Sequence, residues 1–480
     1  MTRPFLMSIV PSWPFRTRLL STASALLALA VFVLISPRGD RTAHAQGFGI
    51  FEQSSCASGS GGTAVANACD DGSAIYFNPS GLTEMEGWTF SGGVTNIIQV
   101  GEFTFDDTRE TTDIDSPVSV LPHLYATYRA TERLGVGVGA YVPFGLNTRW
   151  PADFAGSFSG FDNNLQSIYI QPTAAYQLTD RVSVGGGLIV GVSTVELNQR
   201  LDLAEQQAED GITFANLGIP PGTPFGEATL DADPSVGSGG NFGLEVELTD
   251  RLDVGARFTT PVNIDYSGEA SFQQVETGIE LPANNPLGVP AGTPVDALVE
   301  DTVADGPLVT QDLSTDITMP AQLVAGLSFQ ATPRLNLMFD YQWTGWSTLE
   351  SVELDFENPN LDDAIVLDYD NSSGFRFGTE FAVDETWTLR GGYVYNTPAS
   401  PDQTVTPLAP ESDRNRFSLG VGVRPLSGVE LNLAYQFLMQ NDRRGRTRGP
   451  APGQEISTDL NDGLFSLNAH IIGTTLTVRL

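Results

Sequence analysis

The chain has 480 residues and a formal net charge of −34, with 58 acidic residues against 24 basic ones, none of which is Lys. Because nucleic acids are polyanions, this charge argues against a nucleic-acid partner. The length would allow two or three soluble domains, yet no linker or break in composition appears between Trp88 and Leu480, which favours one large domain behind a small N-terminal segment.

The first 45 residues have the pattern of an export signal. Arg16 and Arg18 precede an apolar stretch over residues 19–35, and a small-x-small sequence at residues 43–45 precedes Gln46. We predict a signal peptide over residues 1–45 that is cleaved before Gln46. The alternative is an uncleaved anchor, although hydroxyl residues thin its apolar run. Beyond it, no stretch approaches the roughly 18 continuous apolar residues of a spanning helix.

Residues 46–87 are rich in Gly, Ser and Ala and contain both cysteines, Cys56 and Cys69. In the oxidising compartment that an export signal implies, a local disulfide is expected. Two unpaired thiols without metal ligands nearby are the alternative. The segment is too small to build a core of its own, so we expect it to fold inside the larger domain.

A short polar phrase recurs along the rest of the chain. Its copies lie at residues 130–133, 178–181, 248–251 and 331–334, with looser versions at 383–386 and 425–428. Each is interpreted as a tight hairpin turn, because the flanking residues alternate between apolar and small or polar types, as strands with two different faces do.

These tight turns occupy every second connection, and the connections between them are long, acidic and irregular. Six turns and seven long connections require fourteen strands if both chain ends lie on the short-turn side. The predicted strands span residues 88–100, 118–130, 133–144, 164–178, 181–200, 239–249, 252–272, 314–331, 334–350, 372–383, 386–397, 414–424, 427–440 and 464–480. This asymmetry predicts an all-β fold, a transmembrane antiparallel β-barrel over residues 88–480 in a bacterial outer membrane.

Acidic residues collect in the long connections, as at Asp106-Asp107 and Asp362-Asp363. A solvated outer surface and a cation-attracting entrance are both compatible with this pattern. The acidic loops therefore do not identify a substrate.

Two of the long connections contain a related phrase, LGIPPGTP at residues 217–224 and LGVPAGTP at residues 287–294. Helices are predicted beside them at residues 201–216 and 295–304. Such elements on a barrel rim would form either a capture groove or a simple packing of loops.

The sequence offers little for catalysis or metal binding. After residue 45 only His123 and His470 remain, no Gly-x-Ser-x-Gly elbow occurs, and no Cys/His cluster has metal-ligand spacing. We predict no enzyme activity and no cofactor. The alternating C-terminal residues 473–480 are those of a last strand that barrel-assembly machinery would recognise, although Leu480 replaces the usual terminal aromatic.

Several runs together resemble the FadL family of outer-membrane transporters of long-chain fatty acids and hydrocarbons. The resemblance extends along the mature chain and is carried by ACDDGSAIYFNPSGL at residues 68–82, YVPFG at 141–145, NIDYSG at 263–268, DYQWTGWS at 340–347, RGGYVYNTP at 390–398 and PESDR at 410–414. It implies a fourteen-stranded monomeric barrel whose lumen is closed by a hatch over residues 46–87. Hydrophobic ligand would be captured outside and released sideways into the membrane.

The resemblance also implies gating and ligand-binding residues. Gly47 and Phe48 would reach into the binding pocket, with Phe48 as the plug. The hatch motif Asn78-Pro79 would lie near an inward kink of the third strand around Pro143, Phe144 and Gly145. A proline lacks the N–H that a strand ladder needs, but a proline at the end of that strand, where it meets its loop, explains Pro143 equally well.

The implied partners are a long-chain fatty acid or another hydrophobic small molecule, the outer-membrane lipid and lipopolysaccharide. A fatty-acid carboxylate would favour a bidentate Arg, and the candidates are Arg149, Arg257, Arg376 and Arg390. An aromatic-hydrocarbon transporter, which needs no such Arg, and a general porin for polar solutes remain the alternatives.

Overall fold

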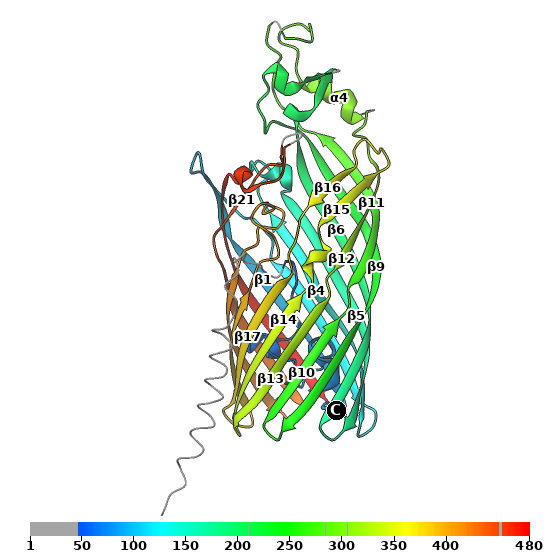
Figure 1. The fold of residues 1–480 in the computed structure, drawn as a ribbon, viewed down its shortest axis with the longest axis vertical. Coiled ribbons are helices and arrows are strands. Elements are labelled where there is room, and N and C mark those ends of the chain that lie inside the picture. Colours follow the sequence, from blue (N-terminus) through cyan, green and yellow to red (C-terminus); the bar gives the residue numbers. More distant parts are fainter. Residues whose placement is uncertain (1–46, 210, 284, 305, 451–453) are drawn as a thin grey trace, which may run out of the picture. The chain divides into compact units, whose positions relative to one another are not determined.

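The structure is a computed structural model that describes residues 47–450 and 454–480, apart from 210, 284 and 305. One antiparallel sheet closes into a barrel (Figure 1). Its fourteen strands are β1 (Trp88–Phe105), β3 (Ser119–Arg129), β4 (Leu134–Arg149), β5 (Asp162–Thr179), β6 (Val182–Asp202), β9 (Pro224–Thr249), β10 continued by β11 (Leu252–Thr259 and Val262–Gln274), β12 continued by β13 (Gln311–Met319 and Gln322–Thr332), β14 (Leu335–Thr344), β17 (Ser372–Ala382), β18 (Trp387–Asn396), β19 (Arg414–Leu426), β20 (Val429–Gln440) and β22 (Gly463–Arg479).

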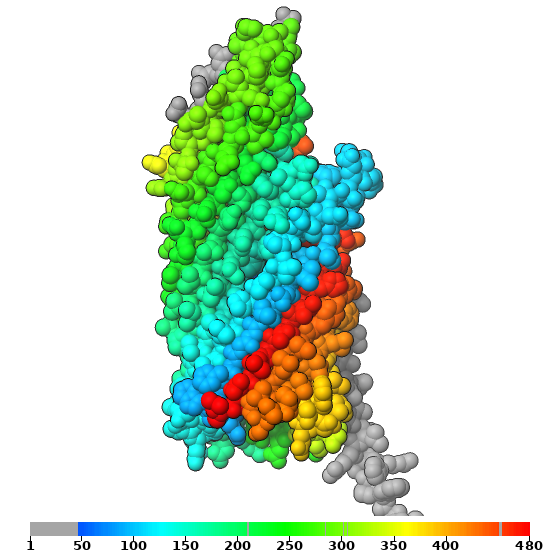
Figure 2. Space-filling model, turned by 180° about the vertical axis from the view of Figure 1, so that it is seen from behind, coloured from blue at the N-terminus to red at the C-terminus, as the bar shows by residue number. Residues whose placement is uncertain are grey.

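The first and last strands close the barrel. Thr89 to Phe105 of β1 pair with Arg479 to Gly463 of β22, and Figure 2 shows the red C-terminal strand lying between the blue first strand and its orange neighbours. The predicted fold class and strand number are confirmed. The predicted signal peptide lies outside the described residues.

The barrel is apolar outside and polar inside, the reverse of a soluble protein. Leu124 and Leu419 are 60% and 68% exposed on the outer face, whereas Gln171, Asn241 and Gln436 are buried inside. Strand residues alternate between the two faces, so the period of two in the sequence produces this arrangement. An apolar outer band is what a lipid environment requires.

The recurrent phrase forms the short turns because its Thr caps the backbone. In three copies, Thr179, Thr249 and Thr332 each accept a hydrogen bond at Oγ1 from the N–H two residues later, at 3.3 Å. This is the local bond by which Thr favours turns. Neighbouring turns are also linked, since Arg181 contacts Asp250 at 2.9 Å. The phrase therefore combines a turn cap with a turn-to-turn ion pair.

Two predicted strands are interrupted, and several are longer than predicted, among them β1, β4 and β9. Breaks occur between β10 and β11 at Pro261 and between β12 and β13 at Pro320, because proline has no N–H to donate to the ladder. The strand predicted to begin at residue 239 begins at Pro224, since the first part of β9 pairs with β6 on one side and with β11 on the other.

The predicted helix at residues 201–216 is wrong, whereas the one at residues 295–304 corresponds to α4 (Asp296–Ala304). Residues 201–216 continue β6 and then form η3 (Leu203–Glu205), the short strands β7 (Gln207–Glu209) and β8 (Ile212–Thr213), and η4 (Phe214–Leu217). Their apolar side chains pack with Val295 and Val299 of the second long loop in one buried cluster. Tertiary packing here overrides local helix propensity, and it supports loop packing over an open groove.

The remaining short elements lie in the other long connections. They are β2 (Thr111–Asp113), η2 (Ser157–Ser159), η5 (Trp346–Thr348), β15 (Ser351–Phe356), β16 (Asp363–Val366), β21 (Arg443–Gly445) and η6 (Thr458–Leu460). No helix within the described residues has the length and apolar character needed to cross a membrane.

Residues 47–87, which we call the hatch, contain α2 (Ser55–Gly59), α3 (Ala74–Phe77) and η1 (Pro79–Thr83). Their side chains do not form a separate core. Phe51, Ile75 and Leu82 of the hatch share one buried cluster with Tyr141 and Tyr169 of the wall. The small N-terminal segment is thus folded inside the barrel, as its size predicted.

Candidate functional site

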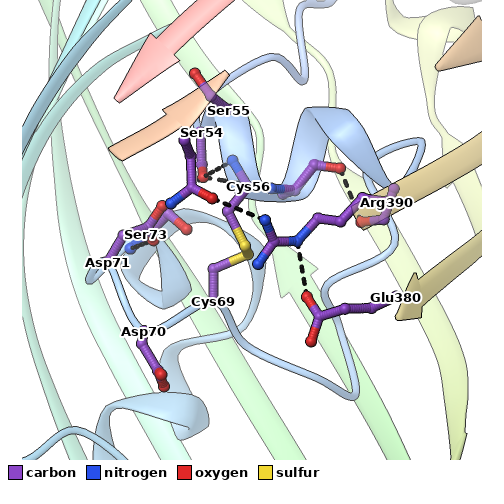
Figure 3. Close-up of a disulfide and its surroundings, with 12 residues drawn as sticks. Ser54, Ser55, Cys56, Cys69, Asp70, Asp71, Ser73, Glu380 and Arg390 are labelled. Carbon is purple, nitrogen blue, oxygen red and sulfur yellow. Dashed lines mark hydrogen bonds and ion pairs between the residues drawn. A yellow bond between two sulfur atoms is a disulfide. The ribbon is translucent and has the colours of Figure 1, made fainter. Parts of the chain in front are cut away.

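A disulfide holds the hatch together (Figure 3). Cys56 in α2 and Cys69 before α3 are joined at an S–S distance of 2.03 Å. Beside it, the Ser54 hydroxyl accepts a hydrogen bond from the Cys56 N–H at 3.1 Å and donates one to Asp71 Oδ2 at 2.5 Å. The disulfide that the sequence suggested is therefore present in the structure. It joins α2 covalently to the segment just before α3.

The hatch backbone packs directly on inward-facing glycines of the wall. A side chain at Gly378 would overlap Thr63, and a side chain at Gly255 would overlap the Val65 carbonyl oxygen. Glycine is needed where backbone approaches this closely. The glycine-rich strands thus provide a surface that fits the hatch.

Asn78 and Pro79 lie against β6 and β9, rather than against residues 143–145 as expected. The Asn78 amide nitrogen donates to the carbonyl oxygens of Val65 at 2.6 Å and Leu244 at 3.1 Å. A side chain at Gly185 of β6 would overlap Pro79. The motif therefore attaches the hatch to β6 and β9, while Leu82 of the same η1 packs on Gly135 near the short-turn end of β4.

The third barrel strand, β4, is distorted at Val142 and Pro143. Its ladder with β5 passes from Tyr141 directly to Phe144, so the two intervening residues have no partner in β5. Pro143 lies inside β4 and not at its loop end, since the strand continues to Arg149. The predicted kink and the observed irregularity therefore coincide in sequence.

The hatch supplies the partners that this part of β4 lacks. The Gln53 side chain accepts from the Val142 N–H at 3.2 Å and donates to the Val142 carbonyl oxygen at 2.6 Å. The Ile50 N–H donates to the Pro143 carbonyl oxygen at 2.8 Å. Because buried backbone groups are almost always paired, residues 48–53 act as a substitute neighbour for β4.

Phe48 extends the contact between the hatch and β4. Its carbonyl oxygen accepts from the Gly145 N–H at 3.0 Å, and its ring centroid lies 4.7 Å from that of Trp346 and 6.3 Å from that of Phe144. Gly47, with φ of 55°, lies so close to Trp346 that a side chain at Gly47 would overlap the indole. The residues predicted at the extreme N-terminus and at the kink therefore meet in one place.

On its other side, β4 separates from β3. The two strands pair only over Leu124–Arg129 and Gly135–Ala140. Beyond that point, the described residues Ser119–His123 and Tyr141–Gly145 have no ladder bonds to each other. We call this stretch the gap. This stretch of the wall faces sideways, toward whatever surrounds the barrel, and Leu121 and Val142 pack together within it.

A cavity of about 410 Å³ lies between the hatch and the gap. Ile97, Leu121, Val142, Leu146 and Leu438 give it apolar walls, and Gly47 to Ile50 form part of its lining. Val120 also lines it, although this side chain is 54% exposed on the outer face of β3. The cavity therefore reaches the protein surface beside β3, while the buried side chains of Leu121 and Val142 share one cluster across the gap.

The four arginines predicted as carboxylate ligands already have partners. Arg257 donates to the Tyr76 carbonyl oxygen at 2.9 Å, Arg376 to the Gly62 carbonyl oxygen at 3.3 Å and Arg390 to Glu380 at 2.7 Å, while Arg149 lies 3.8 Å from Asp115. None of the four lines the cavity as described, whereas Arg414 and Arg416 do.

Arg414 and Arg416 differ in how firmly they are held. Arg416 forms an ion pair with Glu52 and lies 4.3 Å from the centre of the Phe51 ring. Arg414 makes longer contacts, 3.3 Å to the Gly47 carbonyl oxygen, 3.3 Å to Gln440 Oε1 and 4.0 Å to Glu411. Arg414 is therefore the cavity cation that a ligand can more easily recruit.

Sequence reasoning missed three of these residues. Trp346 and Arg414 lie in the runs DYQWTGWS and PESDR, so the family resemblance pointed to these segments without assigning a role to either residue. Gln53 carried no signal, because its importance depends on a contact with Val142, a residue 89 positions away.

Comparison with known proteins gives a consistent result. A family model described as "Outer membrane protein transport protein (OMPP1/FadL/TodX)" matches residues 39–479. The long-chain fatty acid transport protein of Escherichia coli O6:H1 is 25% identical over 413 residues, covering 82% of this chain and 86% of that protein.

Two solved structures share the fold. A FadL homologue of Pseudomonas aeruginosa has a TM-score of 0.74 at 17% identity and covers 90% of this chain and 100% of its own. The toluene transporter TodX of Pseudomonas putida has a TM-score of 0.62 at 18% identity, and the match covers 91% of this chain and 98% of TodX.

Proposed function

Because this chain belongs to the OMPP1/FadL/TodX family of outer membrane transport proteins, we propose that it carries long-chain fatty acids through the cavity and the gap. It is a bacterial outer membrane β-barrel that transports hydrophobic compounds. The proposal concerns which compound it carries and by which route, with hatch-gated passage and release sideways into the membrane.

The observation that carries the proposal is a cavity with apolar walls and polar lining residues, in which Arg414 is the less firmly held of two arginines. Arg414 lies on β19, and the gap lies between β3 and β4, with β20, β22 and β1 between them in the wall. A carboxylate bound at Arg414 would direct its acyl chain across the cavity toward the gap. Arg suits this role, since its hydrogen bonds to carboxylates are charge-assisted.

A sideways exit also agrees with the energetics of an acyl chain. Each CH₂ gains roughly 0.8 kcal/mol by leaving water, so a route that returned the chain to water would oppose the transfer. The gap offers a path from an apolar cavity to lipid. On this path the acyl chain would contact apolar side chains such as Leu121 and Val142, beside polar lining residues such as Asn147.

One comparison favours a second candidate, an aromatic hydrocarbon. TodX, which shares the fold, is a toluene transporter, and an uncharged ring would use the same apolar walls without Arg414. A general porin is less consistent with the hatch, because residues 47–87 fill the lumen with buried side chains.

The test compares three solutes in liposomes that contain the full chain. We expect uptake of labelled hexadecanoate and no passage of labelled glucose. Loss of one charge-assisted hydrogen bond costs about 1.5 to 3 kcal/mol, so R414Q is expected to weaken hexadecanoate binding by at least about tenfold. Toluene uptake should not change.

The control is R133Q, which removes the same charge from an exposed arginine in a short turn. Equal loss of binding in both variants would contradict a role for Arg414. Glucose passage without hexadecanoate uptake would identify a porin, and uptake of toluene alone would identify a hydrocarbon transporter.

A further inference from the structure

A group of hydrogen bonds crosses the space between β3 and β4 at the far end of the gap. The Asn147 side-chain nitrogen donates to the Pro117 carbonyl oxygen at 3.1 Å and to Ser119 Oγ at 3.0 Å. Gln99 of β1 donates from Nε2 to the Asn147 carbonyl oxygen at 2.7 Å. We call these bonds the strap. They replace the ladder that the two strands lack here.

The chemistry of the partners fixes the orientation of Asn147. A carbonyl oxygen can only accept, so the atom of the amide that faces Pro117 must be the donor nitrogen. Arg149, two residues further along β4, continues the connection. Its N–H donates to Ser116 Oγ at 2.8 Å, and its carbonyl oxygen accepts from the Asp115 N–H at 2.8 Å. The wall is thus joined again beyond the gap.

The gap is therefore bounded at both ends. At the short-turn end, the ladder between Leu124 and Ala140 is the last pair of β3 and β4. At the long-loop end, Asn147 and Ser119 form the first hydrogen bond between the two strands beyond that pair. The backbone pair at the short-turn end does not depend on side chains, whereas the bond at the long-loop end does. A substitution can therefore change the height of the gap at the long-loop end.

We propose that Asn147 is a specificity-determining residue, whose strap limits the gap to narrow linear chains. The inference rests on the proposed route through the gap. An extended acyl chain is only one methylene group wide along its length, whereas fused rings are several atoms wide and need a taller opening. Removing the two Asn147 side-chain bonds extends the gap as far as the bonds of Arg149 to Asp115 and Ser116, and so admits wider molecules.

The chain provides a matched control at Asn164. This residue is directly opposite Asn147 in the ladder of β4 with β5 and also lines the cavity. Its side chain makes no hydrogen bond to β3 among the described residues. N164A therefore removes the same atoms from the same cavity and leaves the strap intact.

The experiment measures uptake of hexadecanoate and of a fatty acid that carries a terminal pyrene, by the full chain in liposomes. We expect N147A to raise the ratio of pyrene-lipid to hexadecanoate uptake by about tenfold, the change expected for two lost hydrogen bonds of ordinary strength. S119A, which removes one acceptor, should raise the ratio by a smaller factor. N164A should leave it unchanged.

An unchanged ratio in both N147A and S119A, with normal hexadecanoate uptake, would overturn the role of the strap and leave the proposed function standing. An equal rise in N164A would also overturn it, because cavity volume would then be the cause. Failure of the unaltered protein to move hexadecanoate would instead refute the proposed function on which the inference rests.

Discussion

Replacing Gln53 with Leu tests whether the hatch holds the distortion of β4. Gln53 is 1% exposed, and its amide is the partner of both backbone groups of Val142, which is itself fully buried. Leu fills a similar volume without hydrogen bonds. Each buried group left unpaired costs about 1 to 3 kcal/mol, so two such groups predict a loss of about 2 to 6 kcal/mol. Gln53 Nε2 also donates to the Ile50 carbonyl oxygen at 3.2 Å, but this oxygen keeps a partner in the variant because the Tyr76 hydroxyl donates to it at 3.3 Å.

Without this support, β4 is expected to relax toward β3 and narrow the gap, so Q53L should lose hexadecanoate uptake as well as stability. Stability is measured by urea unfolding in lipid vesicles, and uptake in the same vesicles. The control is Q436A, which removes a buried hydrogen bond from the wall to the Ser58 carbonyl oxygen, 2.7 Å long, away from β4. The reasoning is refuted if Q53L retains both stability and uptake, or if Q436A abolishes uptake equally.

Three further predictions concern the hatch. F48A removes an aromatic contact with Trp346, worth about 0.5 to 1.5 kcal/mol, and should weaken hexadecanoate binding several-fold in a fluorescence titration; unchanged affinity would exclude Phe48 from the pocket. G378V should displace the hatch by overlap with Thr63 and admit glucose, whereas G391V, at a position with ordinary contact distances, should not. Reducing the Cys56–Cys69 disulfide removes a constraint of about 3 kcal/mol for a loop of this length and should speed proteolysis of the hatch. Gel mobility would check that the barrel stays intact, and equal rates of hatch cleavage in the oxidised and reduced proteins would contradict the prediction.

Most of the barrel could be predicted from the sequence because its determinants are local. A strand's two faces alternate within a few residues, and a turn such as that of Thr249 closes through a bond to Arg251, two positions later. The loop helix at residues 201–216 was predicted wrongly for the opposite reason. Its apolar residues are placed by contacts with α4, far along the chain.

The candidate site shows the same division. Pro143 could be identified because the run at residues 141–145 carries it, and Phe48 because the family resemblance implies that the start of the mature chain enters the pocket. The contacts of Asn78 and the partners of the kink could not be identified in this way. Asn147 belongs to no recognisable motif, and its role depends on Pro117 and Ser119 in a different connection. The alternation of residue types along a strand and the composition of the chain do not encode contacts between segments that are distant in sequence.

The position of the hatch has a consequence for how the barrel assembles. The hatch bonds to both strands of the closing pair, since Thr95 of β1 donates to the Glu52 carbonyl oxygen at 3.0 Å and Thr475 of β22 donates to Ser55 Oγ at 2.9 Å. Joining strands so distant along the chain carries a large entropic penalty. A hatch already attached to β1 raises the effective concentration of its surface for the arriving β22. The hatch thereby serves as a template for closure, and a chain without it is expected to close slowly even where the finished barrel is stable.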